Sequence, residues 1–84
     1  MTNRNGSGKK LPGWVRYFVA SNNHGGWFVF KEGLQRPVGT VARKINAIET
    51  AKVLARESAP SQVLVEKADG TFLERYAFTH HYGH

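Results

Sequence analysis

Residues 41–58 read VARKINAIETAKVLARES, and their periodicity decides the fold. Apolar residues recur here on one face of a helix, and charged residues lie away from that face. The apolar positions are Ala47, Ile48, Ala51, Leu54 and Ala55. Thr40 is the expected N-cap, and Pro60 marks the end of the helix. Because the apolar face is rich in alanine, we expect the helix to lie close against a sheet.

Two runs before the helix predict an antiparallel hairpin. Residues 14–20 (WVRYFVA) and 27–33 (WFVFKEG) are rich in β-branched and aromatic side chains, and the polar loop SNNHGG joins them. The chain is then interrupted by Gly33 and by Pro37-Val38-Gly39, so we expect no strand to run through Pro37.

Two runs after the helix predict a second hairpin. Residues 61–67 (SQVLVEK) and 71–78 (TFLERYAF) flank the turn triplet Ala68-Asp69-Gly70. The predicted fold class is therefore α+β. We expect a single small ββαββ domain over residues 11–78, with antiparallel hairpins and one helix packed on one sheet face.

The turn of the second hairpin decides which of its side chains face the helix. A two-residue Asp-Gly turn would set Val65 across from Glu74, which is a poor apolar match. A three-residue loop with its glycine in the left-handed conformation pairs Val65 with Leu73, and Val63 with Arg75. We favour the three-residue loop because it buries Val63, Val65 and Leu73 together.

Alternation along the strands predicts two different sheet faces. The residues expected beneath the helix are Val15, Tyr17, Val19, Trp27, Val29, Val63, Val65 and Leu73. The apolar residues expected on the opposite face are Phe18, Phe28, Phe30, Leu64, Phe72 and Tyr76. So much aromatic surface is unusual on a soluble monomer, so we expect an interface there. The chain's own tails, a second copy or a ligand could cover it, and we favour a homodimer over nucleic-acid bases stacked on the rings.

Charge favours an acidic partner. The 84 residues carry a formal charge of +6, half of it in residues 1–10, a Gly-, Asn- and Ser-rich stretch expected to be a disordered basic tail. We predict a small basic module that binds nucleic acid through phosphate, and the tail is either a solubilising leader or a binding arm. The predicted contact residues are Arg4, Lys9, Lys10, Arg16, Lys31 and Arg75. Because half the charge lies in the tail, a protein-interaction or inhibitor module of phage or mobile-element type is the alternative.

Several classes of protein are disfavoured. The chain has no cysteine, which excludes a disulfide framework and a thiolate metal site and indicates the cytoplasm. No apolar run approaches the roughly 18 residues of a membrane helix. Asp69 is the sole aspartate and lies in a turn, and no catalytic spacing recurs, so we expect neither an enzyme nor a cofactor. Residues 79–84 form an expected flexible His-rich terminus, and we predict no metal site at His80, His81 and His84 or at His24.

Three motifs give the chain a family resemblance. They are Gly25-Gly26-Trp27-Phe28-Val29 running to Glu32-Gly33, the helix AIETAKVLA over residues 47–55, and Val65 followed by Asp69-Gly70. In this order they resemble the prokaryotic domain-of-unknown-function 2188 family, over about residues 17–76. Phe28, Phe30 and the helix start VARK depart from the family pattern. The resemblance implies a ββαββ fold and supplies neither an established activity nor catalytic residues.

Overall fold

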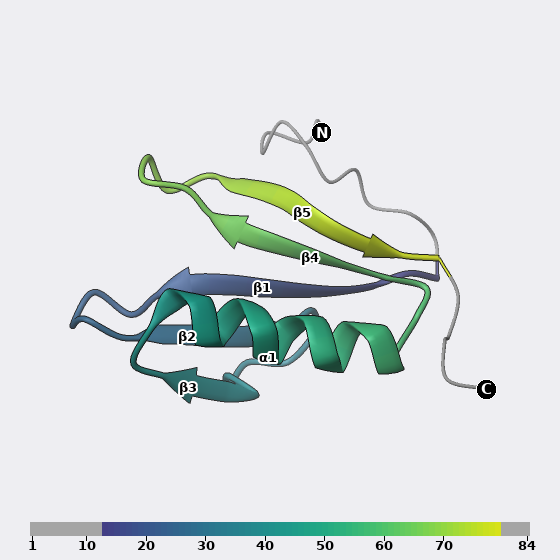
Figure 1. Cartoon of the computed structure of the whole chain (residues 1–84), viewed down its shortest axis with the longest axis horizontal. Coiled ribbons are helices and arrows are strands. Elements are labelled where there is room, and N and C mark those ends of the chain that lie inside the picture. Colours follow the sequence, from purple (N-terminus) through teal and green to yellow (C-terminus); the bar gives the residue numbers. More distant parts are fainter. Residues whose placement is uncertain (1–12, 80–84) are drawn as a thin grey trace.

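One helix covers one face of a five-stranded sheet in the computed structural model, which describes residues 13–79 (Figure 1). The elements in chain order are β1 (Val15–Ser21), β2 (Trp27–Lys31), β3 (Gly39–Val41), α1 (Lys44–Glu57), β4 (Ser61–Glu66) and β5 (Phe72–Phe78). Their order in the sheet is β3-β2-β1-β4-β5. The α+β class and the single helix layer are confirmed, whereas the simple ββαββ description needs two corrections.

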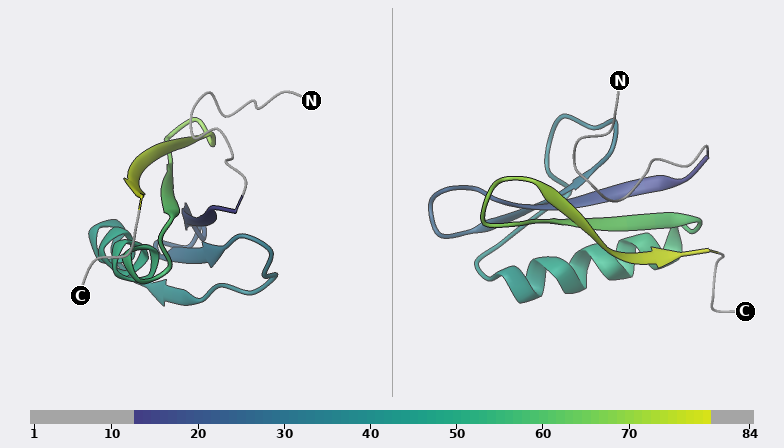
Figure 2. Two further views of the ribbon diagram at one scale, coloured as in Figure 1. Left: turned by 90° about the vertical axis from the view of Figure 1, so that its right-hand side faces the viewer. Right: turned by 90° about the horizontal axis from the view of Figure 1, so that it is seen from above.

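The first correction concerns the centre of the sheet, where the two hairpins join. Strands β1 and β4 pair in parallel, with Tyr17 across from Val63 and Val19 across from Val65. A parallel pair needs a crossover connection, and α1 provides it. The sheet curves around α1, which lies on its concave side (Figure 2). The sheet is therefore mixed, although both hairpins are antiparallel as expected.

The second correction is the short edge strand β3. It pairs with β2 in an antiparallel manner, with Trp27 across from Val41 and Phe28 across from Thr40. The chain turns through Pro37 before this strand begins, as expected. Thr40 lies in β3 and is not the N-cap, so that prediction is wrong. The cap is Arg43, whose side chain makes no capping hydrogen bond.

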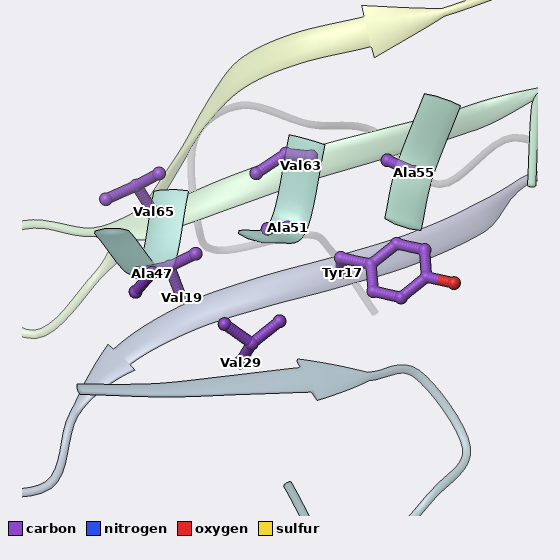
Figure 3. Packing of buried hydrophobic residues seen from close by; sticks show 8 residues of the cluster. All are labelled: Tyr17, Val19, Val29, Ala47, Ala51, Ala55, Val63 and Val65. Carbon is purple, nitrogen blue, oxygen red and sulfur yellow. The ribbon is translucent and has the colours of Figure 1, made fainter. Parts of the chain in front are cut away.

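The alanine face of α1 explains the close packing of helix and sheet. Ala47, Ala51 and Ala55 are fully buried and meet the inner faces of β1, β2 and β4 (Figure 3). The sheet residues of this core are Tyr17, Val19, Val29, Val63 and Val65. Small side chains let the helix backbone approach the sheet, so the valines fill the space between them. The expected core beneath the helix is confirmed for these residues. Leu73, which was expected among them, is 41% exposed on the edge strand β5, so its expected burial is wrong.

Two hydrogen bonds made by hydroxyl groups close the C-terminal end of this core. The Tyr17 hydroxyl lies 3.0 Å from Ser58 Oγ. The Ser61 hydroxyl, which is fully buried, donates a hydrogen bond to the Ala55 carbonyl at the end of α1. Buried hydroxyls need such partners, and these contacts fix the last turn of the helix against β1 and β4.

The β4–β5 hairpin follows the favoured loop but not the whole register. Gly70 has φ +88° and Val65 pairs with Leu73, as the three-residue loop requires. A bulge then shifts the ladder, so Val63 pairs with Tyr76 and not with Arg75. Tyr76 therefore packs beside the core on the helix side, and its expected place on the outer face is wrong. The extra residue reverses the alternation of the strand beyond it.

Candidate functional site

The outer sheet face, opposite α1, carries two pairs of aromatic rings. Phe18 and Phe72 meet edge to face with ring centroids 5.3 Å apart, and Phe28 and Phe30 do so at 5.4 Å. Leu64, on the strand between β1 and β5, is fully buried. These five residues are brought to one face as the alternation predicts, and we call them the outer apolar face.

A hollow of about 360 Å³ opens on the outer apolar face. Its lining includes Phe18, Ala20, Phe30, Glu32, Leu34 and Phe72. Leu34 is 54% exposed and belongs to the connection between β2 and β3, which projects from the side of the sheet away from α1 (Figure 2). Lys31, at the end of β2, also lines this hollow.

Charged groups on the outer face are engaged with one another. Arg16 lies 3.7 Å from a Glu32 carboxylate oxygen and 5.2 Å from the centre of the Phe18 ring. Its side chain is only 11% exposed. Beside it, Gln62 Nε2 donates a hydrogen bond of 3.1 Å to Glu74 Oε1. The predicted phosphate contact Arg16 is therefore largely buried and shares its face with two carboxylates.

The helix side carries cations held over aromatic rings. The nitrogen of Lys44 lies 5.2 Å from the Trp27 ring centre, and that of Lys52 lies 4.5 Å from the Tyr76 ring centre. The corresponding contacts of the two arginines are Arg56 over Phe78 at 5.4 Å and Arg75 over Tyr76 at 5.9 Å. We call Lys44, Lys52, Arg56 and Arg75 the helix-side cations. Their side chains cover partly buried rings, and the Lys52 ammonium also lies 3.6 Å from a Glu49 carboxylate oxygen.

The structure separates the cations that the sequence groups together. Arg16 lies on the outer face, Lys31 at the end of β2, and Arg75 on the helix side. Arg4, Lys9 and Lys10 lie outside the described residues, as do the predicted tail 1–10 and the histidines of the C-terminus. The sequence reasoning missed Lys44, Lys52 and Arg56. The spacing of Lys52 and Arg56, which places both on one helix face, was the available signal.

A second hollow, of about 390 Å³, lies at one end of the sheet. Its lining includes Ser21, Asn23, Trp27, Lys44, Glu66 and Lys67. Ser21 and Glu66 are the last residues of the parallel strands β1 and β4. A hydrogen bond of 2.8 Å from the Ser21 amide to Glu66 Oε1 joins the two strand ends. We call this hollow the end pocket.

The β1–β2 loop beside the end pocket is built around Asn22. Its Oδ1 accepts hydrogen bonds from the amides of His24, at 2.8 Å, and Gly26, at 3.0 Å. A Cβ atom at Gly26 would lie 2.7 Å from Asn22 Nδ2, so a side chain there would collide with the asparagine. This loop explains both of its glycines. Gly25 has φ +87°, which glycine adopts readily, and Gly26 leaves room for Asn22.

One carboxylate of the described residues has a lowered pKa. At the β4–β5 turn, Asp69 Oδ1 accepts hydrogen bonds from the Thr71 hydroxyl, at 2.7 Å, and from the Thr71 amide, at 3.0 Å. The hydroxyl contact is the main reason that the pKa of Asp69 lies below its ordinary value. Among residues 13–79, no three His, Cys, Asp or Glu side chains gather as metal ligands would.

Comparison with known proteins identifies the family. Residues 17–78 match the model of a bacterial family described as "Uncharacterized protein conserved in bacteria (DUF2188)", so the chain belongs to this family. The match runs from β1 to the last residue of β5, and it confirms the resemblance that the three motifs carry. No curated protein and no solved structure matches the chain. Within residues 13–79, the helix is too short and too polar to cross a membrane.

Proposed function

We propose that this member of the DUF2188 family is a non-enzymatic module that binds nucleic acid through its helix side. The observation that carries the proposal is the separation of charge between the two sides of the sheet. The helix side displays the four helix-side cations, whereas the outer face combines Arg16 with the carboxylates of Glu32 and Glu74. A phosphate backbone is attracted to the first surface and not to the second.

The helix-side cations are spaced to follow a backbone. Lys44, Lys52 and Arg56 are distributed along α1, and the rise of 1.5 Å per residue separates the first from the last by about 18 Å. Arg75 comes from β5 and extends the row across the edge of the sheet. The acidic residues of α1 reduce the charge of this side without cancelling it: Glu49 Oε2 lies 3.6 Å from Lys52 Nζ, and Glu57 is the second carboxylate, against four cations. The Glu49 side chain is 63% exposed, so this ion pair is screened by water and a phosphate can compete for Lys52. Up to four phosphate contacts predict that the logarithm of affinity falls against the logarithm of salt with a slope of about −3.6 for duplex DNA and about −2.8 for a single strand.

The test is fluorescence anisotropy with labelled single- and double-stranded oligonucleotides over a range of salt concentrations. We expect Lys52→Gln/Arg56→Gln to reduce the salt slope by about 2, because it removes two phosphate contacts. The matched control is Lys31→Gln/Arg36→Gln, which removes the same charge from residues away from α1 and is expected to leave the slope unchanged. An equal reduction of the salt slope in both variants would contradict the proposal. Absence of oligonucleotide binding by the parent at low salt would contradict it as well.

A second proposal concerns the outer apolar face, which we assign to self-association. The supporting observation is the hollow between Phe18, Phe30 and Phe72, with the exposed side chain of Leu34 at its margin. Two copies related by a two-fold axis could bury these faces against each other as a second core layer. The helix-side cations would then lie on both outer surfaces of the dimer and remain available to nucleic acid.

A protein-interaction module is the alternative use of the outer apolar face. A pull-down from a bacterial lysate with and without nuclease separates the two classes. Loss of all bound material after nuclease treatment supports nucleic acid as the partner. Retention of one stoichiometric protein supports the protein-interaction module, and Phe28→Thr/Phe30→Thr is then expected to release that protein.

A further inference from the structure

The end pocket lies where parallel sheets commonly bind ligands. Strands β1 and β4 run side by side in the same direction, and Ser21 and Glu66 end them at the pocket. In sheets whose parallel strands are joined by a helical crossover, ligands bind beyond the carboxyl ends of the strands. The volume of about 390 Å³ falls near the lower end of the range of about 300–1,000 Å³ that is usual for small-ligand sites.

The chemistry of the lining combines an aromatic ring with two ammonium groups. Trp27 supplies the ring, and Lys44 and Lys67 supply the cations. Asn23 and Glu66 add an amide and a carboxylate, which can hydrogen-bond to the edge of a base or to a ribose hydroxyl. Aromatic side chains stack on the faces of bases, and lysines meet phosphate. This combination suits a nucleotide better than a simple anion, which needs no ring.

We infer that the end pocket binds one nucleotide unit, with its base against Trp27 and its phosphate between Lys44 and Lys67. Lys44 now lies over the Trp27 ring, and its flexible stem allows the ammonium to turn toward the phosphate as the base takes its place. The inference rests on the proposed nucleic-acid binding and sharpens it to single strands, because a paired base cannot enter the pocket. A free nucleotide and the terminal unit of a strand share this chemistry.

The first test reads the ring directly. The chain has two tryptophans, so Trp14→Phe leaves Trp27 as the only source of tryptophan fluorescence. In this background, 5′-AMP and a ten-nucleotide oligodeoxyadenylate are expected to quench the Trp27 fluorescence. The corresponding duplex is not expected to quench it. Quenching by the single strand without quenching by 5′-AMP identifies a unit of the strand as the ligand. Quenching by 5′-AMP alone identifies a free nucleotide.

The second test uses the lysines, whose replacement leaves the core intact. Lys44→Gln/Lys67→Gln is expected to weaken binding of 5′-AMP, or of the single strand where only the strand quenches, by about tenfold or more. The matched control is Lys31→Gln/Arg36→Gln, which removes two cations from residues that do not line the end pocket. The control is expected to leave the binding of 5′-AMP and of the single strand unchanged. Trp27→Phe keeps an aromatic ring at this position, and its melting temperature shows whether the variant is folded. This variant is also expected to weaken binding.

The outcomes distinguish the inference from the function on which it rests. Oligonucleotide binding that depends on salt but does not quench Trp27 fluorescence would overturn the inference that the end pocket binds a nucleotide. The proposed function would still stand. Quenching by 5′-AMP that depends on Lys44 and Lys67, without oligonucleotide binding, would support the pocket as a nucleotide site and overturn the proposed function. Absence of binding by all three probes at low salt would overturn both.

Discussion

Tyr76 lies directly across from Val63 in the β4–β5 ladder, although a regular hairpin after the same loop would bring Arg75 to that position. The bulge turns the Tyr76 ring toward α1, where Lys52 lies 4.5 Å from the ring centre. One extra residue in β5 therefore moves an aromatic side chain from the outer apolar face to the helix side. The same shift places Phe78 beside the core and beneath Arg56.

Replacement of the two neighbouring residues tests this register. Tyr76→Ala is expected to lower the free energy of unfolding by about 2 kcal/mol, because the ring is partly buried against the core. Arg75→Ala, the matched control at the exposed bulge position, is expected to change it by less than about 0.5 kcal/mol. Urea denaturation of the two variants measures the difference. A larger effect at Arg75 than at Tyr76 would show that the regular register is the correct one.

Removal of two aromatic rings tests self-association through the outer apolar face. Phe28→Thr/Phe30→Thr keeps strand propensity and removes the apolar surface, so sedimentation is expected to shift from dimer to monomer. The melting temperature of the parent is expected to rise with protein concentration, and that of the variant is not. The control is Ile45→Thr/Val53→Thr, which removes aliphatic side chains that are 61% and 48% exposed on α1. A monomeric parent, or a dimer that survives the phenylalanine variant, would refute the proposed interface.

Substitution of Gly26 tests whether the β1–β2 loop requires the close approach of Gly26 to Asn22. A Cβ atom there would lie 2.7 Å from Asn22 Nδ2 and 3.3 Å from the Val41 carbonyl oxygen. Gly26→Ala is therefore expected to cost about 1–3 kcal/mol of stability, the usual range for overpacking. Thermal unfolding is the measurement. The control is Ala68→Ser at an exposed loop position, for which a comparable loss would show that the close approach to Asn22 is not the cause.

The lowered pKa of Asp69 in the β4–β5 turn predicts that the free energy of unfolding depends slightly on pH in the acid range. Its pKa in the folded chain lies below the ordinary value of 3.8, chiefly because the Thr71 hydroxyl donates to the carboxylate. The stabilisation is fully present above that value and is lost as the pH falls through the lower pKa of the folded chain. Unfolding of the parent from about pH 5 to about pH 2 is expected to show an acid-dependent loss that Thr71→Val reduces. An identical pH profile in Thr71→Val would refute the role of this hydrogen bond.

The elements with a strong local period were predictable from the sequence. The alanine face of α1 and the alternating runs of both hairpins each repeat several times within one segment, so they indicate helix and strand by themselves. The three residues of β3 carry no detectable period, and they form a strand because β2 offers them an open edge. The parallel pairing of β1 with β4 depends on how distant elements dock, which no local pattern specifies.

The candidate sites were predictable only in part. Phe18, Phe28, Phe30, Leu64 and Phe72 follow from alternation, and the structure places them together. The ion pair of Arg16 was not predictable from a local pattern, because its partner Glu32 comes from the neighbouring strand end, where the hairpin brings the two together. The end pocket draws its lining from segments far apart in the sequence, so only the assembled sheet brings them together.

The parallel pairing of β1 with β4 also determines when the chain can finish folding during synthesis. The first hairpin and α1 emerge before β4, yet Val19 finds its neighbour Val65 only after the helix has been made. Until then, the alanine face of α1 lacks the inner valines of β4. Contacts of such long range slow folding, because the intervening chain must close before they stabilise anything. A nascent chain held at residue 60 is therefore expected to be readily digested by protease, and acquisition of β4 is expected to confer resistance in one step.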